Sequence, residues 1–139
     1  MSCGQSGCRT CCGEDSTQSF LKWSNALSQT PGTYYLSDSS DRTPDANPKA
    51  YPVPELFRAR VLSVNVTGPG GTFLVNLLKN GVVVGTISYG GANPVNGVQR
   101  LVLPDSGVPY TRLDTYDLQV VTTIVGAASF ISATLAVRS

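Results

Sequence analysis

The sequence predicts an all-β protein whose C-terminal part folds as an antiparallel β-sandwich of jelly-roll-like arrangement. Two observations support this fold class. Apolar and polar residues alternate with a period of two in several segments, and turn residues separate these segments at short intervals. The composition agrees, because 14 glycines, 9 prolines and only 14% charged residues suit short strands joined by many turns.

Strands are expected at six places between residues 56 and 139. The strongest hairpin signal is Asn80-Gly81, because both central residues of a two-residue hairpin turn must tolerate a positive φ. The expected strands cover residues 57–66, 72–79, 82–88, 98–103, 115–122 and 129–137. Their inward-facing rows should form the core: Leu62, Val64 and Val66; Phe73, Val75 and Leu77; Tyr116, Leu118 and Val120; and Ile131, Ala133, Leu135 and Val137.

Three further segments are expected before the sandwich domain of residues 56–139. Residues 1–13 form a cysteine-rich attachment arm, residues 14–29 a short amphipathic helix and residues 30–55 a proline-rich extended linker. The linker holds a strand-like patch at residues 33–36, and its prolines favour extended backbone over helix.

The expected helix depends on the spacing of its apolar residues. Phe20, Trp23 and Leu27 recur at intervals of three and four residues, which places them on one face of a helix. A helix this short is marginal in water on its own, so its apolar stripe must pack against something. We expect the stripe to lie at a contact between chains or against a partner.

Composition argues against several classes of function. The chain contains no histidine, the commonest general base and zinc ligand, so we expect neither an enzyme nor a cofactor. The net charge is +1 with scattered basic residues, which does not favour nucleic-acid binding. The apolar runs are far shorter than a membrane span, and the N-terminus lacks a hydrophobic signal core. We therefore expect synthesis in a cytoplasm and no membrane insertion.

All four cysteines, Cys3, Cys8, Cys11 and Cys12, lie in the first 13 residues. An iron–sulfur cluster is disfavoured, because the C-x4-C-x2-C spacing of plant-type ferredoxins needs a further cysteine far downstream, and none exists. Structural zinc remains an alternative, although its four thiolates normally come as two separated pairs. Four free thiols are the remaining alternative, but that many exposed thiols would be a liability.

Disulfide bonding is the interpretation that we favour for these cysteines. A glycine-flanked arm can bring a thiol to a partner's cysteine without straining a fold. Bonds within the arm would close only very short loops and would recover little entropy. We therefore expect at least one disulfide to a different polypeptide.

Two loops of the predicted sandwich are longer than a hairpin requires, at residues 89–97 and 105–114. Loops of this kind are where β-sandwiches commonly bind ligands, and their side chains offer aromatic faces and hydrogen-bonding groups. Ordinary solvated loops are the alternative. The residues that we expect to contact a receptor are Tyr89, Asn93, Asn96, Tyr110, Arg112 and Asp114.

Three segments together resemble a known family. Residues 73–81 read FLVNLLKNG, residues 114–121 read DTYDLQVV, and residues 133–137 read ATLAV. This succession, a Lys-Asn-Gly hairpin followed by a strand opened by an acidic residue and a closing strand of small residues, resembles a β-sandwich domain of tailed-bacteriophage tail fibres and related virion appendages. The resemblance covers roughly the last 80 residues, the size of one small domain.

The resemblance implies a virion structural protein that is commonly trimeric and contacts the host surface. Combined with the cysteine arm, it predicts a short tail fibre that is joined to a baseplate protein by a disulfide. The distal β-domain would then contact a host cell-surface glycan or protein. The alternatives are a capsid decoration or head-fibre protein and, from a different class, a cellular metal-binding protein that uses the cysteine cluster.

Overall fold

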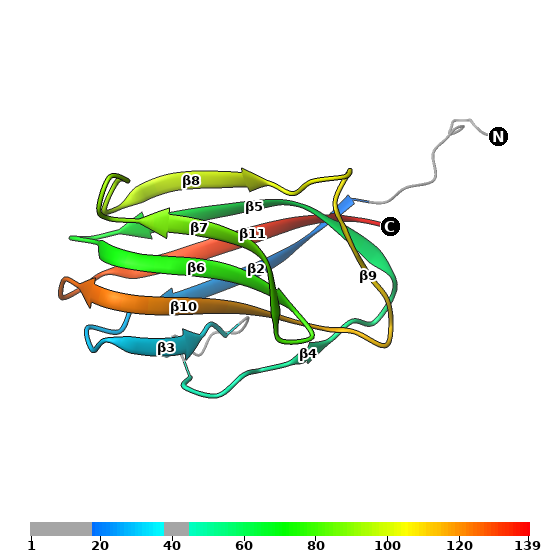
Figure 1. The fold of residues 1–139 in the computed structure, drawn as a ribbon, viewed down its shortest axis with the longest axis horizontal. Helices are drawn as coiled ribbons and strands as arrows, with labels where there is room; N and C mark the ends of the chain where they lie inside the picture. Colours follow the sequence, from blue (N-terminus) through cyan, green and yellow to red (C-terminus); the bar gives the residue numbers. More distant parts are fainter. Residues whose placement is uncertain (1–17, 38–44) are drawn as a thin grey trace.

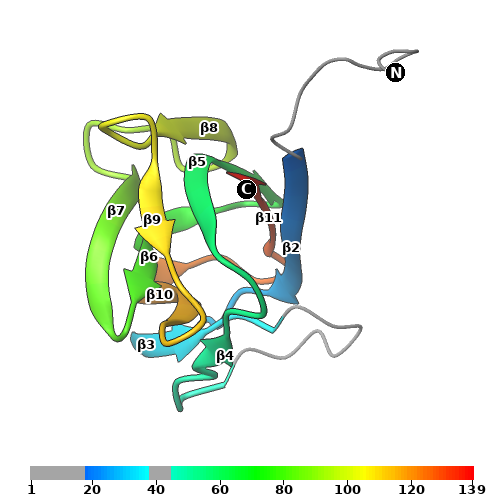
Figure 2. The same cartoon turned by 90° about the vertical axis from the view of Figure 1, so that its right-hand side faces the viewer.

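The computed structural model describes residues 18–37 and 45–139, which form an all-β structure. Ten strands lie in these ranges, and they contain no helix. The strands belong to two sheets whose neighbouring strands are all antiparallel. The two sheets lie face to face as two layers (Figure 1 and Figure 2). Buried apolar side chains from both sheets form the core between them.

One layer, which we call the β5 sheet, has the strand order β2-β11-β5-β8. A short further strand, β9, pairs with the start of β5. The bounds are β2 Gln18–Ala26, β5 Phe57–Thr67, β8 Gly97–Val102, β9 Val108–Tyr110 and β11 Phe130–Arg138.

The other layer, which we call the β6 sheet, has the order β3-β10-β6-β7. The two-residue strand β4 pairs with the start of β10. The bounds are β3 Gly32–Tyr35, β4 Tyr51–Pro52, β6 Gly71–Lys79, β7 Val82–Tyr89 and β10 Thr115–Val125. Consecutive long strands therefore either form a hairpin in one sheet or cross from one sheet to the other.

The core includes all the residues that strand alternation predicts. Every member of the four expected rows is buried, and several are completely inaccessible. Aromatic residues fill the space between the layers, with Phe73 stacked on Tyr89 and Phe57 stacked on Tyr110. The period-two pattern is reliable here because each strand has one face on the core and one face toward solvent.

The Asn80-Gly81 hairpin is confirmed. These two residues join β6 to β7, and Lys79 pairs with Val82 across the turn. Asn80 has a φ of 53° and Gly81 a φ of 79°, the left-handed values that this type of turn requires.

The helix expected over residues 14–29 is not formed in the described part of that segment, where residues 18–26 are strand β2. The strand pairs with β11 along its whole length. Its inward residues are Leu21, Trp23 and Asn25, at a period of two. A polar asparagine in this row hid the alternation, and the spacing of Phe20, Trp23 and Leu27 imitated a helix. Pairing and burial decide such cases against local spacing.

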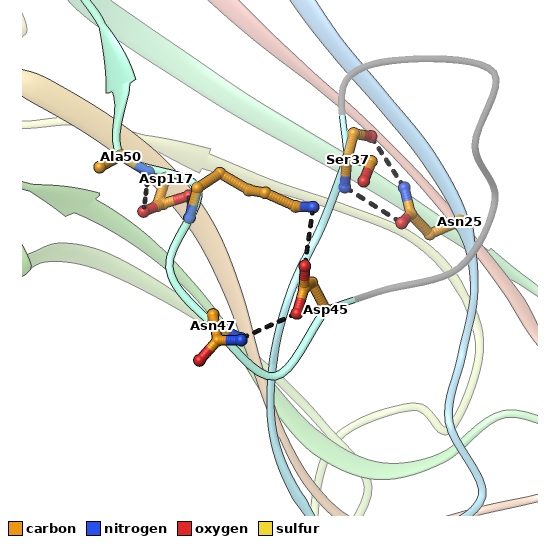
Figure 3. Close-up of polar contacts among 7 residues, drawn as sticks. Asn25, Ser37, Asp45, Asn47, Ala50 and Asp117 are labelled. Carbon is orange, nitrogen blue, oxygen red and sulfur yellow. Dashed lines mark hydrogen bonds and ion pairs between the residues drawn. The ribbon is translucent and has the colours of Figure 1, made fainter.

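Asn25 faces inward because it pairs with backbone rather than with water (Figure 3). Its Nδ2 donates to the carbonyl of Ser37 at 2.9 Å, and its Oδ1 accepts from the N–H of Ser37 at 3.1 Å. The amide thus replaces one step of a strand ladder and ties the end of β2 to the chain leaving β3. A buried amide with both ends bonded costs little.

The expected linker at residues 30–55 contributes strands β3 and β4 to the β6 sheet. Its second half is held by Asp117 of β10, whose carboxylate accepts from the N–H groups of Lys49 at 3.1 Å and Ala50 at 2.8 Å (Figure 3). Burial raises the pKa of Asp117, and these two hydrogen bonds oppose that rise. The sandwich therefore includes residues on both sides of position 56.

A first prediction tests whether β2 belongs to the core. Trp23 is 2% exposed, whereas Phe20 on the other face of the same strand is 55% exposed. Replacing Trp23 by alanine should lower the free energy of unfolding by about 3–5 kcal/mol. The matched change Phe20→Ala should cost less than about 1 kcal/mol. Urea unfolding of both variants measures the difference, and equal losses would contradict the strand assignment.

Candidate interaction surface

The sandwich has two ends, and the N-terminal chain enters at one of them. At one end β2 begins at Gln18, directly opposite Arg138 of β11, so the chain that precedes Gln18 enters there. We call this the entry end. Cys3, Cys8, Cys11 and Cys12 lie in that preceding chain, outside the described residues, and their bonding stays a prediction. The opposite end, at the left of Figure 1, is the tip.

The two loops expected to bind a receptor lie at opposite ends. The loop at 89–97 is bonded to the start of β6, where the N–H of Gly71 donates to the carbonyl of Val95 at 2.9 Å. The loop at 105–114 is bonded to the end of β6, where Asn80 Nδ2 donates to Asp114 at 2.7 Å. A strand of this length separates them by roughly 27 Å. They do not form one site.

Tyr89 and Tyr110, two of the expected receptor residues, are core residues. Each reaches from its own sheet to the backbone of the other sheet. The hydroxyl of Tyr89 in β7 lies 2.8 Å from the Gly97 carbonyl and 3.2 Å from the Val64 carbonyl. The hydroxyl of Tyr110 in β9 donates to the Leu78 carbonyl at 3.1 Å. They lock the two layers together and are not available to a ligand.

Both hydroxyl groups are held in their neutral form. Burial raises the pKa of Tyr89 to about 12. Burial also raises the pKa of Tyr110, with a smaller contribution from the negative charge of Asp114. A phenol that is buried away from water and donates to a carbonyl acts as a structural hydrogen-bond donor. Neither tyrosine therefore acts as an acid or base near neutral pH.

Asp114 closes the loop in which it lies. Its carboxylate accepts from the N–H of Thr111 at 2.7 Å and from the side chain of Asn80 at 2.7 Å. Asn80 in turn accepts from the N–H of Thr115 at 2.8 Å. The Thr111 and Asn80 hydrogen bonds, with the charge of Lys79 nearby, lower the pKa of Asp114. No spacing in the sequence indicates this link between Asp114 and the hairpin turn.

The other expected residues have separate positions. Asn96 donates through Nδ2 to the Gly68 carbonyl at 2.8 Å and so fixes the tip. Asn93 is exposed at the tip, and Arg112 is exposed at the entry end beside a hollow lined by Glu55 and Leu56. Of the six residues, Asn93 and Asn96 at the tip and Arg112 at the opposite end are exposed, and of these Asn96 has its amide bonded to Gly68.

At the tip, three loops bind one another through backbone groups, and we call them the tip cluster: residues 67–71, 89–97 and 125–130. Besides the bond of Gly71 to Val95, the N–H of Gly126 donates to the Gly70 carbonyl at 2.8 Å. The N–H of Gly70 donates to Ser129 Oγ at 2.9 Å. The glycine-rich stretch 68–71 looks in the sequence like a simple turn, but it is the centre of this cluster.

The tip cluster contains no charged residue. Its exposed groups are neutral, and they include Pro69, Asn93, Val95 and Ala127. A ligand held by such a surface is recognised by hydrogen bonds and apolar contact rather than by charge, as neutral sugars and protein surfaces are. The tip is therefore the best-defined candidate surface for a neutral ligand.

Within residues 18–37 and 45–139, no three histidine, cysteine, aspartate or glutamate side chains gather in a way that could hold a metal ion. No helix long and apolar enough to cross a membrane occurs in the same ranges.

Comparison with known proteins adds no relative. The chain matches no model of a known protein family, and no curated protein is significantly similar to it.

A second prediction concerns the close packing at the tip. Gly70 and Gly91 both have a positive φ, 71° and 61°. A Cβ at Gly70 would lie 1.8 Å from the Val95 carbonyl oxygen, whereas a Cβ at Gly91 would meet nothing within 4 Å. Gly70→Ala should cost at least about 2 kcal/mol. Gly91→Ala should cost only about 1 kcal/mol of backbone strain. Denaturant unfolding compares them, and similar losses would refute the tip packing.

A third prediction uses the lowered pKa of Asp114. A carboxylate whose pKa is lower in the folded state stabilises the fold above its unfolded pKa, and this contribution is lost as the pH falls through the folded pKa. Between about pH 5 and pH 2, Asp114→Asn should therefore lose less unfolding free energy than the natural protein. The variant should still show part of the pH dependence, because the pKa of Asp45 is also lowered. Thermal unfolding across this range measures the slopes, and identical slopes would contradict the assigned role.

Proposed function

We propose that the chain is a virion structural protein, a short tail fibre or similar appendage that is attached through its N-terminal cysteines and presents its tip to the host surface. The observation that most supports this is the strand order. Numbered along the chain, the eight long strands pair as first-eighth-third-sixth and second-seventh-fourth-fifth. That is the arrangement of a jelly roll, which recurs in viral capsid and lectin domains.

Fold alone does not determine function. A second support for the proposal is the difference between the two ends of the domain. The cysteine-bearing segment joins at the entry end, and the uncharged tip cluster lies at the other end of the strands. A covalent attachment at the entry end would leave the tip free to contact a glycan or protein on a cell. This proposal includes a homotrimer, as the family resemblance implies.

The proposed function is not catalytic and uses no cofactor. The titratable groups that sequence analysis placed in binding loops have structural partners instead: Tyr89, Tyr110 and Asp114 bond to neighbouring strands and turns. Such groups support a binding or assembly role better than proton transfer. Proton transfer needs a group whose pKa lies near the working pH and that a substrate can reach.

A capsid decoration or head-fibre protein is the second candidate, because jelly rolls recur in viral capsid domains. In that role the same entry end would face the capsid rather than a baseplate. Both candidates place the protein in the virion and use the cysteine arm as a tether. Immunogold labelling of virus particles from the genome that encodes the chain separates them by its position on tail or capsid.

A fourth prediction tests the tether. Each disulfide forms when two thiols lose their protons and pass two electrons to an oxidant, such as dioxygen met after release from a reducing cytoplasm. Reductant should therefore detach the chain from purified particles. A chain with serine at Cys3, Cys8, Cys11 and Cys12 should detach on dilution without reductant. Gels run with and without reductant show the bonded partner. Release by a chelator alone would instead support a zinc site.

A further inference from the structure

Basic residues are concentrated on the outer face of the β5 sheet. Its five strands contain five basic residues and no acidic residue. The described part of the chain has two salt bridges, and both lie elsewhere, between Lys49 and Asp45 and between Lys79 and Asp114. The basic residues of the β5 sheet are Lys22, Arg58, Arg60, Arg100 and Arg138.

Strand register places these residues on one surface. Arg58 of β5 lies directly opposite Arg138 of β11. Two rows further along, Lys22 and Arg100 stand at the two edges of a single cross-strand row, with Thr134 and Ser63 between them. Arg58 donates to the Gly107 carbonyl at 3.0 Å and Arg138 to Gln18 Oε1 at 3.4 Å, so both guanidinium groups have neutral partners. No carboxylate side chain of the sheet's strands neutralises their charge, which leaves it available to an anionic partner.

A β-bulge adds the fifth cation to this face. The register of β5 against β11 shifts by one residue, so that Val61 faces Ala136 and Ala59 faces Val137. Arg60 is the extra residue. Ala59 and Leu62 are fully buried, whereas Arg60 and Val61 are both partly exposed, which puts both on the outer side. Without the bulge, strict alternation would point the side chain of either Arg60 or Val61 toward the core.

An apolar row runs between the basic residues. Phe20, Ala136, Val61 and Val102 stand side by side across the four strands. Phe20 is 55% exposed and Val102 is 69% exposed. Solvated surfaces rarely align large apolar side chains across a whole sheet, so a row of this kind marks a contact surface.

A shallow hollow lies where the apolar row meets the arginines. It has a volume of about 120 Å³ and is lined by Gln18, Arg60, Val61, Ala136, Val137 and Arg138. A water molecule occupies about 30 Å³ of liquid, so the hollow has room for a carboxylate and the methylene groups that bear it. Arginine is the residue best suited to bind a carboxylate there, through two parallel N–H donors.

We propose that the outer face of the β5 sheet binds an acidic protein surface, with a partner carboxylate in the hollow between Arg60 and Arg138 and partner apolar side chains on the Phe20 row. Charge complementarity identifies the partner as anionic. The apolar row favours a protein, because a nucleic-acid backbone or a sulfated glycan carries charged groups along its whole length and offers less apolar surface to exposed phenyl and isopropyl groups than protein side chains do. This inference does not depend on the virion assignment.

The test uses the full chain and defined polymers as probes. Binding to poly-glutamate, to a glutamate–tyrosine copolymer of equal length and to heparin is measured by titration calorimetry at fixed salt. The face variant is Arg58→Gln with Arg138→Gln. Its matched control is Lys49→Gln with Lys79→Gln, which removes the same charge from outside the β5 sheet. Phe20→Ser tests the apolar row, and thermal unfolding shows that each variant is folded.

The expected result is that the copolymer binds more tightly than poly-glutamate and that the face variant weakens both by about tenfold or more, with less than about twofold change in the control. Phe20→Ser should abolish the preference for the copolymer. Equal weakening by the control, or no binding of either polypeptide, would overturn the proposal. Tighter binding of heparin, insensitive to Phe20→Ser, would overturn it in favour of an anionic glycan.

Discussion

The two strands nearest the C-terminus, β10 and β11, are interior strands, and the rest of the fold depends on this constraint. On one side, β10 pairs with β3 and β4 and β11 pairs with β2, and these partners all come from the N-terminal part. Trp23 of β2 then fills the core edge-on against Tyr116 of β10. The first and last thirds of the sandwich are thus bonded and packed to each other, and neither buries its apolar face alone.

Local hairpins were predictable from the sequence, whereas long-range partners were not. Strands β5, β6, β7, β10 and β11 agree with the expected segments to within a few residues, because alternation and Asn80-Gly81 are local signals. Strand β2 was missed, since Asn25 interrupts its apolar row and the partner that satisfies Asn25, Ser37, lies 12 residues away. The three residues of β9 were too few to give a pattern.

The candidate site was only partly predictable for the same reason. Tyrosine in a long loop suggests ligand binding, yet the hydroxyl partners of Tyr89 are Gly97, 8 residues away, and Val64, 25 residues away, and the partner of Tyr110 is 32 residues away. No spacing rule reveals these partners. The glycines of residues 68–71 likewise look like turn residues, although Gly70 is required by the approach of another loop. The outer basic face was hidden because its five cations lie on four strands that are far apart in sequence, and only strand register brings them together.

The indole of Trp23 has a consequence for spectroscopy. It is the single tryptophan of the chain, it lies in the strand that docks the N-terminal part, and its Nε1 has no hydrogen-bond partner among the described residues. An indole in such a dry, apolar environment emits at short wavelength, and it shifts to the red when water reaches it. The intrinsic fluorescence of this protein therefore reports on whether β2 is packed against the core. Detachment of β2 can be followed in the unmodified molecule.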